Sequence, residues 1–358
     1  MYDVKKLLGA MIRNNISDIH LKSDSAPLVR VNGELVTASE EKITAETMKT
    51  IVESVLLPDQ AEKFRRDCDI DFAYSVEGLS RFRVNMSMER GNPSIVLRVI
   101  PTEVKTFEEL NLPDEAFRKL ANESRGLILI AGITGSGKTT TLNAIINHIN
   151  ENTRAKIVTI EDPIEYYHFD KKSSISQREI GRDAKSFESA LKYSLRQDPD
   201  IIVLGELRDS ESMKAAILAA ETGHLVLSTI HTIDTSQTID RIISSYPPHL
   251  QSGVCAQLAY VVKGIVAQRL VPSKDCSAQY PICEILIGTS LIKNIIAEKK
   301  LGDIAKALEQ GSFYGMRTFD QDIYKLFTEG KISSETAFEN ATNVDDLSLR
   351  LKGIERTS

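Results

Sequence analysis

Long apolar runs are missing from this 358-residue chain. The longest, such as Leu127 to Ala131 and Ile201 to Leu204, fall far short of the roughly 20 residues that a membrane-spanning helix needs. The opening residues, Met1 to Lys6, also lack the apolar stretch and the small-residue cleavage site of a secretory signal. We therefore expect a cytoplasmic protein with no transmembrane segment of its own.

Cysteine is scarce and is never spaced as C-x-x-C, which excludes a zinc ribbon and a redox motif of that kind. Cys276 and Cys283 can meet on a hairpin, but a pair of reduced thiols without a metal fits a cytoplasmic chain better. The four cysteines are Cys68, Cys255, Cys276 and Cys283.

A surplus of basic residues is also missing, because 44 Lys and Arg stand against 50 Asp and Glu, for a net charge of −6. Nucleic-acid binding by counterion release needs such a surplus, so we expect no nucleic-acid partner. Tryptophan is absent, but 42% hydrophobic and 26% charged residues are typical of an ordinary globular protein. This balance excludes disordered and fibrous classes.

The residues that are present predict an α/β protein with more than one domain, since 358 residues exceed the roughly 100–200 of a single domain. Residues 1–100 mix helical and alternating patterns and predict a small α+β domain, followed by a proline-interrupted linker over 101–112. Short apolar runs within 113–288 predict a parallel sheet covered by helices, and 289–358 predicts helices and a polar tail. These runs are 126–131, 155–160, 200–204 and 223–229.

The strongest local signal is the pattern G-x-x-x-x-G-K-[ST] over 132–139, which directly follows a predicted buried strand and precedes a predicted helix. In such a loop the glycines let backbone N–H groups surround a phosphate, Lys138 lies between the β- and γ-phosphates, and the Thr139 hydroxyl is offered to Mg²⁺. The alternative is a glycine-rich turn that merely joins strand to helix. The residues expected to bind ATP are Gly132, Thr134, Gly135, Ser136, Gly137, Lys138, Thr139 and Thr140.

Hydrolysis needs further groups, because a water must be positioned and the developing charge stabilised. Ligands gather at the carboxyl ends of strands in open α/β sheets, where this chain has Glu161, Asp162 and Glu165 after one strand and Glu206 after another. His231 ends a further strand and can contact a γ-phosphate oxygen. The alternatives are acids that complement a helix dipole and a histidine that is purely structural.

Arg81 and Arg83 stand two apart on one predicted strand and therefore share a face. They are either a solvated basic edge or arginine fingers that neutralise transition-state charge from across a domain or subunit boundary. The sequence alone leaves both readings open.

Taken together, these motifs resemble those of the secretion ATPases, and specifically of the PilT-like retraction ATPases of type IV pili. The resemblance covers about residues 1–340 and lies in an ordered set of boxes. These are Ser17 to His20, Arg81 to Asn85, the Walker A loop, Ile160 to Glu165 (Asp box), Arg196 to Asp209 (Walker B), Ala220 to Thr232 (His box) and Thr238 to Arg241.

The resemblance implies a PAS-like N-terminal domain and a RecA-like ATPase core, assembled as a homo-hexameric ring that powers pilus retraction and twitching motility. It implies that Glu206 acts with Mg²⁺ and water, that Glu165 helps to activate water, and that His231 senses the γ-phosphate. Arg81 and Arg83 match nucleotide-contacting arginines. It also implies an inner-membrane platform protein as partner, peripheral association with the membrane through that partner, and a paralogous pilus ATPase as a second partner.

Two departures bear on the direction of force. The tetracysteine module of assembly and type II secretion relatives is absent, which favours retraction. By contrast, Leu291 to Glu298 matches the retraction motif AIRNLIRE at four of its positions and departs most at Leu291 and Ala297. Pilus extension or type II secretion therefore stays an alternative, as does a nucleotide-gated regulatory switch. A DNA translocase is disfavoured by the net charge.

Overall fold

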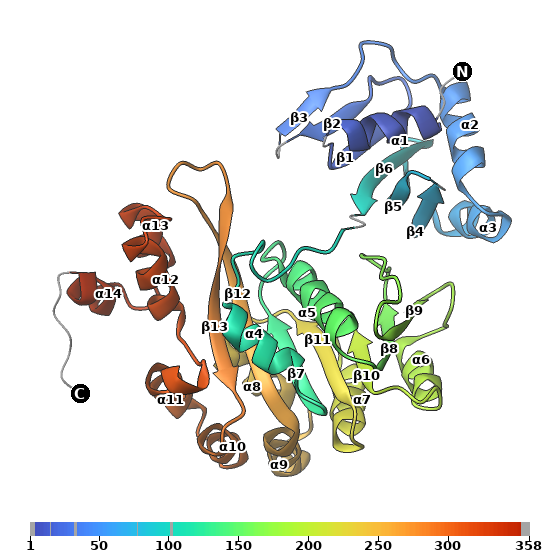
Figure 1. Cartoon of the computed structure of the whole chain (residues 1–358). Coiled ribbons are helices and arrows are strands. Elements are labelled where there is room, and N and C mark those ends of the chain that lie inside the picture. Colours follow the sequence, from blue (N-terminus) through green and yellow to red (C-terminus); the bar gives the residue numbers. More distant parts are fainter. Residues whose placement is uncertain (1–3, 15, 32–33, 77, 101–102, 352–358) are drawn as a thin grey trace. The chain divides into compact units, whose positions relative to one another are not determined.

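The computed structural model describes residues 4–14, 16–31, 34–76, 78–100 and 103–351, and these fall into two compact units (Figure 1). Unit 1 comprises Met1–Glu103 together with Pro163–Tyr167, and unit 2 comprises Val104–Asp162 and His168–Ser358. Across the described ranges no helix is both long enough and apolar enough to cross a bilayer.

Unit 1 is built on a six-stranded antiparallel sheet with the strand order β3-β2-β1-β6-β5-β4. Apolar side chains alternate along its strands, so that Phe82, Val84 and Met86 of β5 reach a core shared with the helices. The elements are α1 (Val4–Arg13), β1 (Asp18–Lys22), β2 (Leu28–Val31), β3 (Glu34–Thr37), α2 (Ala45–Val55), α3 (Pro58–Asp67), β4 (Asp69–Val76), β5 (Ser80–Glu89) and β6 (Asn92–Ile100).

Unit 2 contains a seven-stranded sheet with the order β13-β12-β7-β11-β10-β8-β9, parallel except for the antiparallel edge pair β12 and β13. Its strands and first helices are α4 (Asp114–Ala121), β7 (Gly126–Ala131), α5 (Lys138–Asn152), β8 (Lys156–Glu161), β9 (Ser174–Glu179), α6 (Phe187–Ser194), β10 (Ile201–Leu204), α7 (Ser210–Glu221), β11 (Leu225–Ile230), α8 (Thr235–Ser244), α9 (Gln251–Val261), β12 (Val262–Pro272) and β13 (Gln279–Ile287). The remaining helices are α10 (Ser290–Ala297), α11 (Ile304–Gln310), α12 (Phe319–Thr328), α13 (Ser334–Asn340) and α14 (Val344–Leu351).

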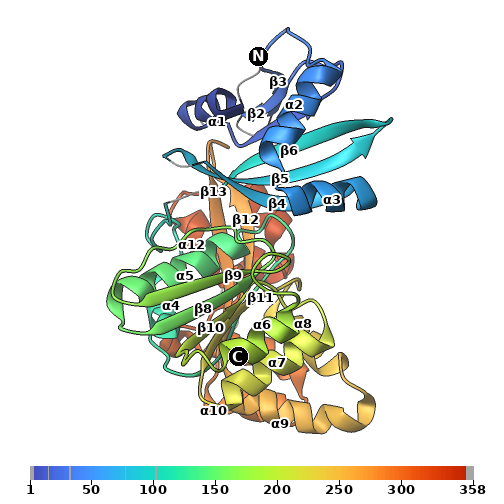
Figure 2. The same ribbon diagram turned by 90° about the vertical axis from the view of Figure 1, so that its right-hand side faces the viewer.

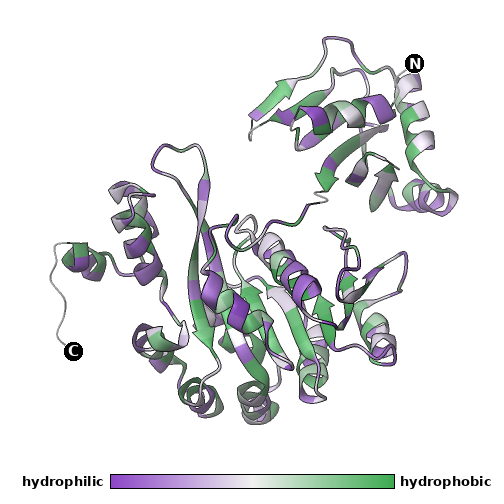
Figure 3. Cartoon of the chain, viewed as in Figure 1, coloured by the Kyte–Doolittle hydropathy of each residue, from purple (hydrophilic) through white to green (hydrophobic). Residues whose placement is uncertain are grey.

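The central strands β7, β10 and β11 are buried along their whole length, in keeping with their predominantly apolar sequences. Figure 3 colours these strands predominantly hydrophobic. Helices α4 and α5 cover one face of the sheet and α6 to α9 cover the other (Figure 2), as right-handed crossovers dictate. The predicted α/β class with a RecA-like core is confirmed.

The boundary between the units differs in detail from the expected linker over 101–112. Residues 101–102 lie outside the described part of the chain, whereas Phe107 and Leu112 are buried in the core of unit 2. The short segment Pro163–Tyr167 groups with unit 1, although the chain before and after it belongs to unit 2. All four cysteines are free thiols, and Cys283 is fully buried on β13.

Candidate functional site: a phosphate-binding loop and an acid-histidine pair

The glycine-rich loop leaves the end of β7 and enters α5 at Lys138. Gly135 and Gly137 have φ angles of 81° and 85°, a left-handed conformation that side chains with a Cβ rarely adopt. Gly137 is also the N-cap of α5, so the free backbone N–H groups of the first helical turn open onto the loop. This local geometry is what the sequence pattern predicts for an anion site.

The inner side of the loop is packed so tightly that glycine is required there. A Cβ on Gly132 would lie 2.3 Å from Ser136 Oγ, and a Cβ on Gly137 would lie 2.7 Å from Gln268 Nε2. The Nζ of Lys138 reaches across the loop and donates to the carbonyl of Ile133 at 2.8 Å. The loop is thus tightly packed on its inner side, with the Lys138 ammonium held across it.

A carboxylate and an imidazole meet at the carboxyl edge of the same sheet. β7 pairs with β11 and β11 pairs with β10, all in parallel, so the residues that follow these strands emerge side by side. Glu206 Oε1 lies 3.2 Å from His231 Nε2, and Glu206 Oε2 accepts from Arg208 Nε at 2.9 Å. By accepting this hydrogen bond, Glu206 raises the pKa of Arg208. The structure therefore brings two of the predicted site residues together beside the loop.

Glu161, at the end of β8, has a different environment. Its side chain is buried and accepts from Thr159 Oγ1 at 2.6 Å and from Gln177 Nε2 at 3.2 Å. Because these contacts tie it to β8 and β9, the structural alternative suits Glu161 better than a role toward ATP. Asp200, which lies within the stretch that resembles Walker B, is at the opposite end of β10 and accepts from the backbone N–H of Lys156 at 2.8 Å.

Within unit 1, β5 places Arg81 and Arg83 next to the segment that carries Glu165. Arg83 Nη1 lies 3.6 Å from Glu165 Oε1, and the Arg81 guanidinium stands 4.5 Å from the centre of the Tyr167 ring. Arg81 is buried, so it is not a solvated edge residue. Three further predicted site residues are therefore gathered in this unit.

Two functional neighbours escaped the sequence analysis. Gln268 on β12 contacts the phosphate-binding loop, and no local pattern marks it, because Lys263 and Arg269 also stand on this strand. His168 follows the Asp box by three residues and is buried against α5, where its Nε2 lies 2.7 Å from Asn143 Oδ1. Burial, and secondarily Lys171, lowers the pKa of His168 to about 4.

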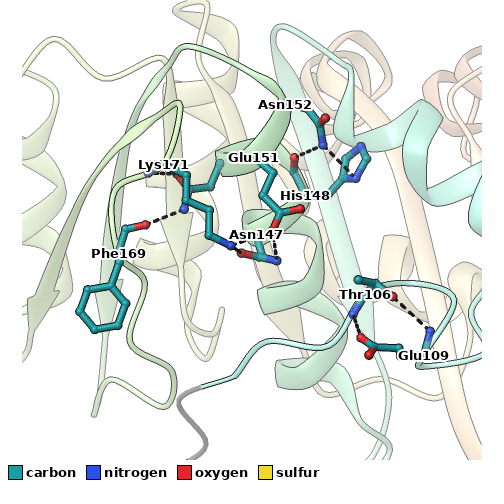
Figure 4. Close-up of polar contacts among 9 residues, drawn as sticks. Thr106, Glu109, Asn147, His148, Glu151, Asn152, Phe169 and Lys171 are labelled. Carbon is teal, nitrogen blue, oxygen red and sulfur yellow. Dashed lines mark hydrogen bonds and ion pairs between the residues drawn. The ribbon is translucent and has the colours of Figure 1, made fainter. Parts of the chain in front are cut away.

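The segment that follows His168 is hydrogen-bonded to α5 at several positions along the helix (Figure 4). Lys171 Nζ donates to Asn147 Oδ1 at 2.9 Å and to Glu151 Oε1 at 2.7 Å, and Asn150 Nδ2 donates to the carbonyl of Phe169 at 2.8 Å. The bond from Lys171 lowers the pKa of Glu151. The helix that begins at the loop is therefore held in place by the segment that follows the Asp box.

The donor set suits a magnesium nucleotide. Mg²⁺ is usually held by one or two protein oxygens together with phosphate oxygens and water. The Thr139 hydroxyl at the start of α5 and the Glu206 carboxylate that follows β10 are hard oxygen donors of the required kind.

Comparison with known proteins agrees with this geometry. The family model described as type II/IV secretion system protein matches residues 2–317. The type IV pilus ATPase PilU of Pseudomonas aeruginosa is 38% identical over 350 residues, covering 98% of this chain and 91% of the relative. The type IV pilus retraction ATPase PilT of the same organism is 37% identical over 339 residues, covering 95% and 98%.

A crystal structure of the pilus retraction motor PilT with bound ADP matches with a TM-score of 0.90 at 37% identity, covering 97% of this chain and 99% of that one. The chain belongs to the type II/IV secretion system protein family and is an ATPase. Within the family it is one of the PilT-like type IV pilus retraction ATPases.

Proposed function

We propose that this chain works as a homo-hexameric motor that hydrolyses ATP with Mg²⁺ and retracts type IV pili. The observation that carries the proposal is the pair of Glu206 and His231 beside a complete phosphate-binding loop, in a chain similar to PilT and PilU over nearly its whole length. The motor works in the cytoplasm at the inner face of the membrane and passes force to an inner-membrane platform protein. A paralogous pilus ATPase is a second partner.

The roles follow from chemistry. The backbone amides of the loop and the Lys138 ammonium bind the phosphates, and Thr139 and Glu206 hold Mg²⁺. The metal supplies charge neutralisation on the phosphate oxygens when bound. Glu206 also orients the attacking water, and His231, whose Nε2 is 3.2 Å from Glu206 Oε1, reports whether a γ-phosphate is present.

Three residues of unit 1 also have roles in this proposal. Arg81 and Arg83 supply positive charge to the phosphates, and Glu165 helps to activate water. The 3.6 Å contact between Arg83 and Glu165 supports a joint role, because each group can exchange this partner for nucleotide or water during the cycle.

The cellular test is deletion of the gene in its own bacterium, followed by complementation. Because pili that cannot be withdrawn accumulate, we expect the deletion strain to keep or gain surface pili and to lose twitching. Wild-type protein should restore motility, whereas Glu206→Gln and Lys138→Ala should not. A strain without surface pili would overturn the retraction assignment and favour extension.

The biochemical test measures phosphate release by the purified full-length protein. We expect many turnovers from the wild type and none from Glu206→Gln, with both proteins folded by circular dichroism. Nucleotide binding without repeated turnover by the wild type would favour a regulatory switch, and parental turnover by Glu206→Gln would contradict the role given to that carboxylate.

A further inference from the structure

The side chain of Gln268 lies directly beneath the phosphate-binding loop. β12 pairs in parallel with β7 in a register that sets Ala267 opposite Ala131, so Gln268 comes level with the first residue of the loop. The residue is 3% exposed, although a glutamine is rarely buried unless its amide is fully hydrogen-bonded. Among the polar residues of β12, which are Lys263, Gln268 and Arg269, it is the buried one.

Both ends of the Gln268 amide are engaged. Its Nε2 donates to the Ser136 carbonyl at 2.8 Å, and its Oε1 accepts from Thr141 Oγ1 at 2.7 Å. The carbonyl of Ser136 can only accept, so the nitrogen must face it and the orientation of the amide is fixed. One side chain thus joins the loop to the first turn of α5.

This contact sets the direction of one peptide group in the loop. The peptide between Ser136 and Gly137 is planar and trans, so its N–H points away from its carbonyl. Because the carbonyl is held toward Gln268, the Gly137 N–H is turned to the opposite side, away from the protein core. Gly137 accommodates this with its left-handed φ of 85° and with no Cβ to strike Gln268 Nε2.

We propose that Gln268 is a positioning residue for nucleotide binding, which holds the Ser136–Gly137 peptide with its N–H aimed at the phosphates before any nucleotide arrives. The inference rests on the proposed phosphate-binding role of the loop and adds to it a residue outside the motif. In this way β12 supplies a hydrogen-bond donor to a carbonyl of the loop.

The test compares ADP affinity and thermal unfolding of the full-length protein for Gln268→Met, Gln268→Glu and Thr141→Val. The methionine fills the same space without hydrogen bonds, the ionised carboxylate sets an acceptor against the Ser136 carbonyl, and the valine removes only the donor to Oε1. We expect ADP affinity to fall roughly tenfold in Gln268→Met, more in Gln268→Glu and less in Thr141→Val.

The matched control is Ser173→Ala. Ser173 is buried in the same unit, and its hydroxyl donates to the Thr153 carbonyl at 2.6 Å, at the far end of α5 from the loop. The Ser173→Ala variant should lower the unfolding temperature by as much as the Gln268 variants do, and it should leave ADP affinity unchanged. Equal ADP affinity in wild type and all Gln268 and Thr141 variants would overturn the proposal, and Thr141→Val keeps the test valid if a Gln268 variant does not fold.

Failure of the proposed function is distinguishable from failure of this inference. If the wild type itself did not bind ADP, the phosphate-binding role of the loop would be wrong. If it bound ADP but the deletion strain lost its pili, only the direction of force would be wrong, and the comparison of Gln268 variants would stand unchanged.

Discussion

At the scale of single residues, Glu206 and His231 form the pair to which we assign the chemistry of hydrolysis in the proposed function. They follow different strands, β10 and β11, and meet only because those strands are parallel neighbours that end at one edge. Glu206 is the more enclosed of the two, with 22% of its side chain exposed against 41% for His231. This difference suits the roles proposed for them, because a carboxylate that orders water is better partly sheltered and an imidazole that contacts a ligand has to be accessible.

We expect His231→Ala to lower kcat for ATP hydrolysis by roughly tenfold or more, as removal of a group that contacts developing charge does. ADP lacks the γ-phosphate, so its affinity should stay at the wild-type value. Steady-state phosphate release and ADP titration measure the two quantities. A variant with weakened ADP binding and unchanged kcat would show that His231 serves the diphosphate instead.

His168 gives a prediction about stability and pH. Its pKa is about 4 in the folded chain against an ordinary value of 6.5, so the unfolded chain binds more protons between these values. Above pH 6.5 the neutral, buried imidazole makes its full contribution to the free energy of unfolding. This contribution, roughly 3 kcal/mol, is lost as the pH falls to 4.

The stability gap between wild type and His168→Gln should therefore narrow as the pH is lowered from 7 to 4, measured by urea unfolding. The control is His249→Gln, because His249 is exposed and should leave the pH dependence of wild type in place. A gap that stayed constant across this range would contradict the buried neutral state of His168.

The residues of this site were not equally predictable. Gly132 to Thr139 stand together in the chain, and each does a task that restricts its type, so the pattern is legible without a structure. Gln268 is 132 positions from Ser136, and nothing local distinguishes it from any other glutamine. Its role depends on the register of β12 against β7, which a linear pattern does not encode.

At the scale of elements, the sequence analysis predicted the apolar strands of unit 2 and missed the strands that carry polar residues. β7, β8, β10 and β11 are continuous apolar runs because both of their faces are covered. β9 has the sequence SISQRE and forms an edge of the sheet, where one side needs no apolar partner. β12 carries Lys263, Gln268 and Arg269 and therefore does not stand out as a buried strand.

Helix α10 has one face that packs in the core and one face that is exposed. Ile292, Ile295 and Ile296 are buried on its inner face, whereas Leu291 is 54% exposed and Ala297 is also exposed. The two positions that depart most from the retraction motif therefore lie on the outer face. The departures change a surface that a partner can contact and leave the packing of the helix intact.

We expect the double variant Leu291→Ala, Ala297→Arg to keep the wild-type unfolding temperature and ATP turnover, because exposed substitutions cost little stability. Twitching in the parent bacterium should decline, since the outer face would no longer match its own partner. Motility assays and phosphate release measure the two effects. Val344→Ala, which trims a 49% exposed side chain on α14, should change neither, and unaltered twitching in the double variant would remove α10 from the partner surface.

At the scale of the whole molecule, length and the change of pattern near residue 100 predicted two parts, but not how the chain is shared between them. The chain passes from unit 1 to unit 2 after Glu103, returns for Pro163–Tyr167 and passes back at His168. No sequence pattern predicts that these five residues group with unit 1, because this grouping depends on tertiary contacts with residues such as Arg81 and Arg83. The segment contains Glu165, so a proposed catalytic acid belongs to the smaller unit.

The position of β12 late in the chain affects when the loop can form its bond to Gln268 during translation. The bond from Gln268 to Ser136 joins residues 132 positions apart, and a ribosome adding about 5–20 residues per second needs roughly 7 to 26 s to cover that distance. During this interval the loop of the nascent chain lacks the hydrogen bond from the Gln268 amide. Each newly synthesised chain can thus form this bond only after residue 268 has been translated.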